Sequence, residues 1–292
     1  MLEEKSKAEI EQNFPSRVAV LIPAFNANDK LNRTLKSIWA QDTPCEIFVI
    51  DDGSDIPIKI TVPDSAHKTH VIRLNKNQGI VNALNVGLET ILDAGFDYIA
   101  RQDAGDIDLS HRLERQSQFL DANPGVNLVG SSVDFIDGGG NIKFSFTAVT
   151  GEGNLQNRMR YSPAFIHPSI MMRASALRDI GFYSHKAPHA EDYDLFFRLA
   201  RHGGVNNIRE TLVVTEYDPH GISMGKRRSS LASRLMLQIR YFDLRNVHSF
   251  LGVVQTCVLL CLPYEIVVRL KTHLSQMPMA TKMNIPGPAN SL

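Results

Sequence analysis

At 292 residues, the chain is long enough for one large domain or two small ones with an ample hydrophobic core. A hydrophobic fraction of 43% and a charged fraction of 21% are ordinary for a soluble globular protein. Lysine and arginine number 31, as do aspartate and glutamate, so no overall positive field indicates a nucleic-acid partner and any anion binding must be local. Three cysteines without metal-type CxxC spacing favour a reducing compartment.

The N-terminal third predicts alternating strands and helices. Residues 1–16 are polar and lack the apolar core of a signal peptide, so we expect an N-terminal arm on a cytoplasmic protein. The apolar run "RVAVLIPAFN" (17–26) is typical of a strand buried on both faces. A helix follows, which Asn28 or Asp29 can cap, and then a second buried strand, "EIFVIDDGS".

The same alternation continues to about residue 125, with further strands at "HVIRL" and "DYIARQD" and a helix after each. It predicts an α/β fold with a mostly parallel sheet covered by helices on both faces. In such sheets ligands bind at the carboxyl ends of the strands. Three candidate segments lie at those ends: Pro23–Asn26, Asp51–Ser54 and Asp103–Asp106.

The second half is less regular. "VNLVGSSVDFIDGGGNIKFSF" predicts a hairpin, a polar segment extends to Tyr161, and "HPSIMMR" predicts one more strand. "EDYDLFFRLARHGG" predicts a helix with an acidic first turn. We expect four regions: an arm at 1–16, a catalytic domain at 17–225, a C-terminal helical segment at 226–276 and a disordered tail at 277–292.

The most apolar stretch, Ser249–Lys271, is interrupted by Gln255, Pro263 and Glu265, so it is too short and broken to span a membrane. One interpretation is an interfacial helix whose basic end contacts lipid headgroups. The other is an ordinary core or dimer helix.

Acidic residues carry the chemistry. Asp52 follows a buried strand and can accept hydrogen bonds from a nucleobase or ribose, or simply cap the next turn. Asp103 and Asp106 are hard oxygen ligands suited to a divalent cation that bridges a diphosphate, although Asp106 could instead cap a helix. Glu191 and Asp192 either stabilise a helix start or supply a general base whose pKa is raised by its neighbour.

Six motifs occur in order: "VLIPAFN", "FVIDDGS", "NQGIVNALNVGL", "RQDAGD", "HPSIMMR" and "AEDYDLFFRL". Together they resemble family 2 glycosyltransferases, the inverting enzymes of the GT-A fold, and in particular those that build bacterial surface polysaccharides. The resemblance covers residues 17–224. It implies a nucleotide-sugar donor, a glycan or lipid-linked acceptor, and a peripheral place on the cytoplasmic membrane face.

The resemblance also implies roles for single residues. Pro23, Ala24 and Asn26 would line the donor site, and Asp52 would contact the nucleobase. Asp103 would hold ribose and metal, and Asp192, beside Glu191, would be the catalytic base. His220 would lie near metal or diphosphate.

One position departs from the family pattern. Gly105 occupies the place of the second aspartate of the DxD motif, the usual ligand of Mn²⁺ or Mg²⁺, and Asp106 comes one residue late. Asp106 can substitute if the backbone turns at Gly105; alternatively, Asp103 binds the metal with His220 and water.

Two other functions compete with glycosyl transfer. A sugar-phosphate nucleotidyltransferase needs a glycine-rich basic loop after the first strand, which "PAFNANDKLNR" matches poorly. A non-catalytic nucleotide-binding homologue, or a scaffold in a glycan-assembly complex, would have no evident use for the base Asp192.

Overall fold

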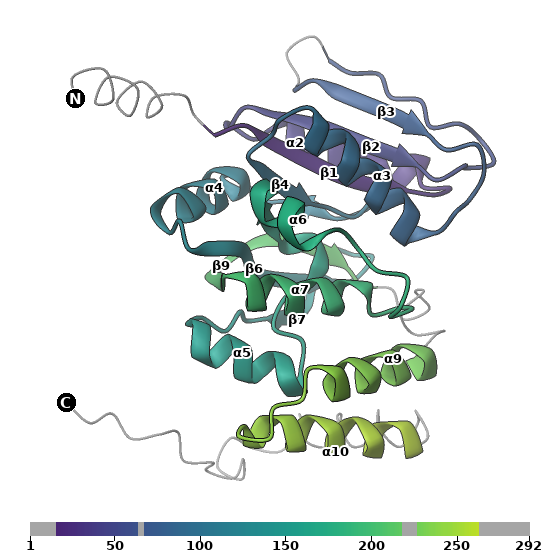
Figure 1. Ribbon diagram of the computed structural model, residues 1–292. Coiled ribbons are helices and arrows are strands. Elements are labelled where there is room, and N and C mark those ends of the chain that lie inside the picture. Colours follow the sequence, from purple (N-terminus) through teal and green to yellow (C-terminus); the bar gives the residue numbers. More distant parts are fainter. Residues whose placement is uncertain (1–15, 64–66, 218–226, 263–292) are drawn as a thin grey trace, which may run out of the picture.

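The computed structural model describes residues 16–63, 67–217 and 227–262. Its strands and helices alternate through the first half of the chain, as predicted (Figure 1). The strands are β1 (Val18–Ala24), β2 (Cys45–Asp51), β3 (Thr69–Arg73), β4 (Tyr98–Arg101), β5 (Ile107–Asp108), β6 (Val126–Ile136), β7 (Ile142–Phe146), β8 (Met171–Arg173) and β9 (Gly204–Glu216).

Helices cover both faces of the sheet and extend beyond it at the C-terminal end. They are α2 (Asn28–Trp39), α3 (Ile80–Asp93), α4 (Arg112–Ala122), α5 (Glu152–Tyr161), the 3₁₀ turn η1 (His167–Ser169), α6 (Ala174–Ile180), α7 (Glu191–His202), α9 (Arg227–Arg240) and α10 (Val247–Cys261).

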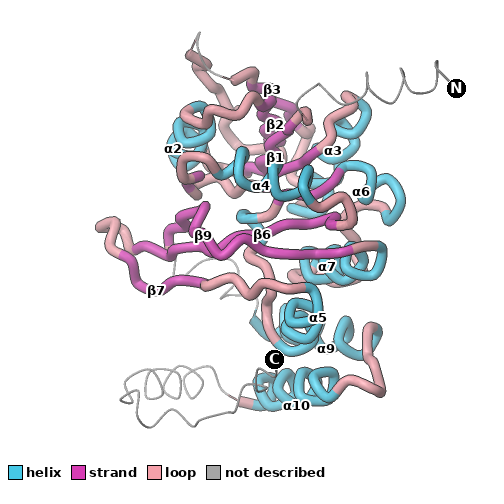
Figure 2. Tube along the Cα trace, turned by 90° about the vertical axis from the view of Figure 1, so that its left-hand side faces the viewer, coloured by secondary structure: helices cyan, strands magenta, loops and turns pink. Residues whose placement is uncertain are grey.

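The strands form one mixed sheet in the order β3-β2-β1-β4-β8-β6-β9-β5, with β7 paired to β6. The strands β3, β2, β1 and β4 are parallel, whereas β8 runs antiparallel to both β4 and β6. The long strands β6 and β9 are again parallel, and Figure 2 shows them as a second layer below β1–β3. The predicted α/β fold with helices on both faces of the sheet is confirmed.

Strand β1 is buried on both faces because a helix packs against each side. Its Ala19 and Leu21 join one apolar cluster, which includes residues of α3. Its Val18, Val20 and Ile22 join the other, which includes residues of α2. This explains the uninterrupted apolar run in the sequence, since a strand with one wet face would alternate.

The structure corrects several local predictions. Helix α2 begins after Ala27, and neither Asn28 nor Asp29 caps it. The polar segment before Tyr161 is helix α5, and the 13-residue strand β9 was not anticipated at all. In "HPSIMMR" the first three residues form η1, so only Met171–Arg173 is strand.

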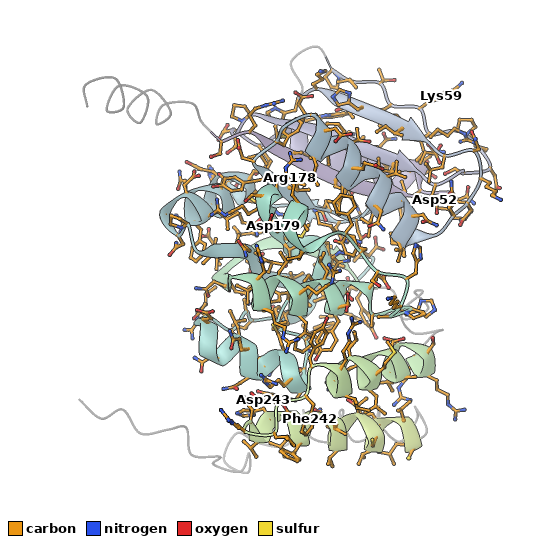
Figure 3. The ribbon with its side chains drawn as sticks, in the orientation of Figure 1. Asp52, Lys59, Arg178, Asp179, Phe242 and Asp243 are labelled. Atoms are coloured by element: carbon orange, nitrogen blue, oxygen red, sulfur yellow. The ribbon has the colours of Figure 1, made fainter. Side chains whose placement is uncertain are left out.

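Helices α9 and α10 pack together below α5, and Figure 3 labels Phe242 and Asp243 in the turn between them. Helix α10 approaches α5 closely, because a Cβ on Gly252 would lie 2.0 Å from the carbonyl oxygen of Arg160. Its opposite face is exposed and apolar, with Val247, Leu251, Val254 and Val258 one or two turns apart. Among the described residues, no helix is long and apolar enough to cross a membrane.

The turn after β2 depends on a glycine. Gly53 has a φ of +68°, and a Cβ there would lie 2.3 Å from the backbone carbon of Lys76 and 2.6 Å from the nitrogen of Asn77. Both the backbone conformation and the contact with the β3–α3 loop therefore require a residue without a side chain.

We expect Gly53→Ala to lower the free energy of unfolding by about 2 kcal/mol or more, because strain and the backbone clash add. The matched control is Gly138→Ala, since nothing lies within 4 Å of a Cβ at Gly138 in the hairpin loop. Urea unfolding measures both variants. Equal effects of the two substitutions would contradict the close approach.

Candidate active site

Hydrogen bonds join the loops that follow β1 and β2 into one unit. The amide N–H of Asn26 donates to Ser54 Oγ at 2.9 Å, and its side chain exchanges two hydrogen bonds of 2.9 Å with Asp55. Pro23 and Ala24 are the last two residues of β1, and both are buried. In the predicted segment Pro23–Asn26, Phe25 and Asn26 are exposed, and of the three predicted donor-site residues Asn26 is the exposed one.

The carboxylate of Asp52 faces the start of α3 (Figure 3). Its two oxygens accept hydrogen bonds from the amides of Gln78 at 2.8 Å and Gly79 at 2.9 Å. These donors and the N-terminal dipole of α3 stabilise a negative charge that is almost completely buried. A nucleobase that binds Asp52 has to share these oxygens with the helix.

The neighbouring Asp51 has a structural role. Burial alone would raise the pKa of Asp51, but hydrogen bonds from Ser54 and Ile58 and an ion pair of 2.6 Å with Arg73 hold it below its usual value. Asp51 therefore fastens β2 to β3.

Asp103 and Asp106 are the first and last residues of a tight turn. The amide of Asp106 donates to the carbonyl of Asp103 at 3.2 Å, and Gly105 has a φ of +117°. Helix α2 holds this turn: Thr34 Oγ1 bonds Asp106 O and the amide of Gly105, each at 2.8 Å, and Arg33 donates to the carbonyl of Gly105. The backbone thus does turn at Gly105.

The two carboxylates of this turn have different surroundings. Asp103 is partly exposed, whereas Asp106 is buried and its Oδ2 has no hydrogen-bond partner among the described residues. Burial, and then the negative charge of Asp103, raise the pKa of Asp106 to about 8.

This donor set is chemically suited to a divalent cation. A cation would neutralise both carboxylates and satisfy the free oxygen of Asp106, and Mg²⁺ typically takes one or two carboxylates and completes its shell with phosphate oxygens and water. Within the described part of the chain, no group of three or more His, Cys, Asp or Glu side chains is placed so that it could hold a metal ion. His220 lies outside the described residues.

A buried arginine occupies the centre of the site. Arg101, the last residue of β4, forms an ion pair of 2.5 Å with Asp103 and is almost inaccessible to solvent. Its charge also acts on His167 and Asp192. The sequence analysis assigned no role to Arg101. A permanently charged arginine at the end of a predicted buried strand was the feature that could have indicated one.

A second buried ion pair supports this position. Arg112 and Asp108 are both fully buried, and their side chains pair directly. Arg112 also donates to the carbonyl of Arg101 at 2.7 Å. The pair of Arg112 and Asp108 thereby fixes the backbone at the end of β4.

Asp192 and Glu191 lie in the first turn of α7. Burial, and then the charge of Glu191, raise the pKa of Asp192 to about 6, against a hydrogen bond of 2.7 Å from the amide of Tyr193. Asp192 also lines a cavity of about 270 Å³. A carboxylate tuned towards neutrality at a cavity wall has the properties of a general base.

His167 and Tyr183 complete the buried surroundings. A hydrogen bond of 2.7 Å joins His167 Nε2 and Tyr183 Oη. Burial, and then the charge of Arg101, hold the pKa of His167 well below its usual value, while burial raises that of Tyr183. Both side chains are therefore neutral at physiological pH.

Comparisons with known proteins identify the family of the chain. The model of the family "Glycosyl transferase family 2" matches residues 19–181. The putative glycosyltransferase EpsE of Bacillus subtilis is 31% identical over 225 residues, which cover 74% of this chain and 78% of EpsE. An Escherichia coli UDP-Gal:alpha-D-GlcNAc-diphosphoundecaprenol beta-1,3-galactosyltransferase is 27% identical over 188 residues, 63% of this chain and 67% of that enzyme.

Solved structures share the fold. S. aureus TarS 1-349 in complex with UDP-GlcNAc superimposes with a TM-score of 0.62 at 18% identity, over 82% of this chain and 71% of that chain. The mannosyltransferase PcManGT from Pyrobaculum calidifontis, in complex with GDP-Man and Mn²⁺, gives a TM-score of 0.56 at 16% identity, over 94% and 86%. With the family match covering more than half of its residues, the chain belongs to glycosyl transferase family 2.

Proposed function

We propose that this enzyme transfers a sugar from a nucleoside diphosphate sugar to a hydroxyl of a glycan or lipid-linked acceptor, with inversion at the anomeric carbon, in the synthesis of a cell-surface polysaccharide. The observation that carries the proposal is the pair of acidic elements around Arg101: the turn with Asp103 and Asp106, and the base Asp192. The acceptor class is supported by the E. coli relative, whose name specifies a lipid diphosphate sugar.

In the proposed reaction Asp192 accepts the proton of the acceptor hydroxyl. The resulting oxygen attacks the anomeric carbon from the face opposite the nucleoside diphosphate, and the bond from that carbon to the diphosphate oxygen breaks. Asn26 and Asp52 contribute to the donor site, with Pro23 and Ala24 beneath it, and Asp103 binds the ribose. Glu191 acts on Asp192 through its charge.

We assign the divalent cation, Mn²⁺ or Mg²⁺, to Asp103 and Asp106, with His220 as a further ligand. When bound, it supplies positive charge that stabilises the departing diphosphate. The free oxygen of Asp106 and the Mn²⁺ in the complex of PcManGT support this assignment.

We further propose that the described helices of the predicted segment 226–276, α9 and α10, rest on the cytoplasmic face of a membrane. The support is the exposed apolar row of α10, formed by Val247, Leu251, Val254 and Val258, with the exposed Arg245 beside it. Apolar side chains flanked by a cation are typical of helices that bind anionic bilayers.

The first test concerns Asp192. We expect kcat/KM to fall as the pH drops below about 6, because the raised pKa leaves the base protonated there, and to be constant above it. Asp192→Asn should reduce turnover by about 10²- to 10⁴-fold. Glu191→Gln removes the charge that raises the pKa of Asp192, so the fall of kcat/KM should move to lower pH. Transfer by Asp192→Asn at the wild-type rate would refute the assignment of Asp192 as the base.

The second test identifies donor and metal. Titration with UDP, GDP, dTDP and CDP, each with and without Mn²⁺ or Mg²⁺, should raise the melting temperature for one nucleotide and more strongly with metal. At a hundred times Kd the stabilisation is about 2.7 kcal/mol. Asp106→Asn should lose the metal-dependent part, and Asp42→Asn, in the α2–β2 turn before the start of β2, should keep it. No response to any nucleotide would contradict the donor site.

The third test addresses the membrane. The full-length protein should sediment with liposomes that contain phosphatidylglycerol, and Leu251→Gln combined with Val254→Gln should reduce the bound fraction several-fold. Ile142→Gln removes an exposed apolar side chain from the distant hairpin and serves as the control. If the wild-type protein does not sediment with these liposomes, the proposed membrane contact is wrong.

A further inference from the structure

The cavity beside Asp192 lies between α5, α7 and α9. Its volume is about 270 Å³, enough for a sugar-sized group. Aromatic side chains form much of its wall, which suits the apolar face of a sugar ring. The lining residues that matter here are Phe165, His189, Asp192, Tyr193, Phe196 and Arg234.

Arg234 enters this cavity from α9 with unused hydrogen-bonding capacity. Its Nη2 donates to the carbonyl of Tyr161, but its Nε is buried without a hydrogen-bond partner among the described residues. No described carboxylate lies within 4.0 Å of the guanidinium. Arg234 is partly buried, and a cation withdrawn from water without an anion is stabilised by a ligand that supplies negative charge.

A second guanidinium adds to the positive charge. Arg158 donates to the carbonyl of Pro163 at 3.3 Å and lies over the ring of Tyr161, and it too has no described carboxylate partner. Burial, and then the charge of Arg158, lower the pKa of Arg234. The neighbouring Arg160, by contrast, pairs with Asp243 at 3.4 Å.

The position of α9 suggests what binds there. It lies between α7, which carries the base, and α10, which carries the exposed apolar row (Figure 1). A molecule with its reacting hydroxyl at Asp192 and an apolar chain along α10 would pass Arg234. A group with two negative charges at that point would match the two arginines.

We infer that this cavity is the acceptor site and that Arg234, assisted by Arg158, binds a phosphate group of the acceptor. The inference rests on the proposed function and extends it, because it assigns the acceptor an anionic linkage and names the residue that recognises it. Guanidinium groups bind phosphate in bidentate geometry, which also fixes the orientation of the sugar towards Asp192.

Isothermal titration with geranyl diphosphate tests the inference without knowledge of the acceptor sugar. The full-length protein is first saturated with the nucleoside diphosphate that stabilises it, so that the donor site is filled. We expect the wild-type protein to bind the probe and Arg234→Gln to raise its Kd tenfold or more. Arg240→Gln, an equal charge change on the same helix outside the cavity, should alter Kd less than twofold. Geraniol, the neutral probe, should not distinguish Arg234→Gln from the wild-type protein.

Three outcomes would overturn the inference: no binding of geranyl diphosphate by the wild-type protein, equal binding by Arg234→Gln, or loss of binding when the donor site is filled. The last would assign Arg234 to the donor diphosphate.

Melting temperature and nucleotide affinity establish that Arg234→Gln is folded with an intact donor site. If nucleotides bind but the probe does not, the acceptor inference fails while the transferase remains; if no nucleotide binds, the proposed function itself fails.

Discussion

The charge of Arg101, buried at the end of β4, connects the titratable groups of the site, because it acts on Asp106, His167 and Asp192 alike. A permanent cation without solvent needs an anion beside it, and Asp103 meets that need from the adjoining turn. Burial, and then the same charge, hold the pKa of His167 well below its usual value. Burial and Glu191 raise the pKa of Asp192 to about 6, against the amide of Tyr193 and the charge of Arg101, which lower it. The proposed base is thus held between opposing influences.

Arg101 can have this effect only because the framework around it is rigid. The buried pair of Arg112 and Asp108 fixes the backbone at the end of β4. From the other side, Arg33 of α2 links the carbonyl of Gly105 to Glu216 at the end of β9, with a distance of 2.7 Å to each. Elements far apart in the sequence therefore set the position of one turn.

The sequence was informative where local patterns suffice. The apolar run of β1 and the segments at the strand ends predicted the parallel half of the sheet, and "DAGD" pointed to the turn. Strand β9 could not be anticipated, because polar residues such as the half-buried Asn206 and the exposed Arg209 interrupt its apolar pattern, while its long pairing with β6 is a tertiary contact. The environments of Arg101 and Arg234 could not be predicted either, because they are formed by tertiary contacts between segments far apart in the sequence.

The helix that carries Asp192 lies beyond residues 19–181, the part that matches the family model. In the proposed function, the strand ends that bind the donor lie within this part of the chain, and the helices α7 and α9 that line the acceptor cavity lie outside it. Substitutions in α9 would then change the acceptor side of the site and leave the strand ends at Asp52 and Asp103 as they are. Under the proposed roles, the two substrates of one carboxylate, Asp192, can therefore vary independently, which offers a route to new linkages from an existing donor.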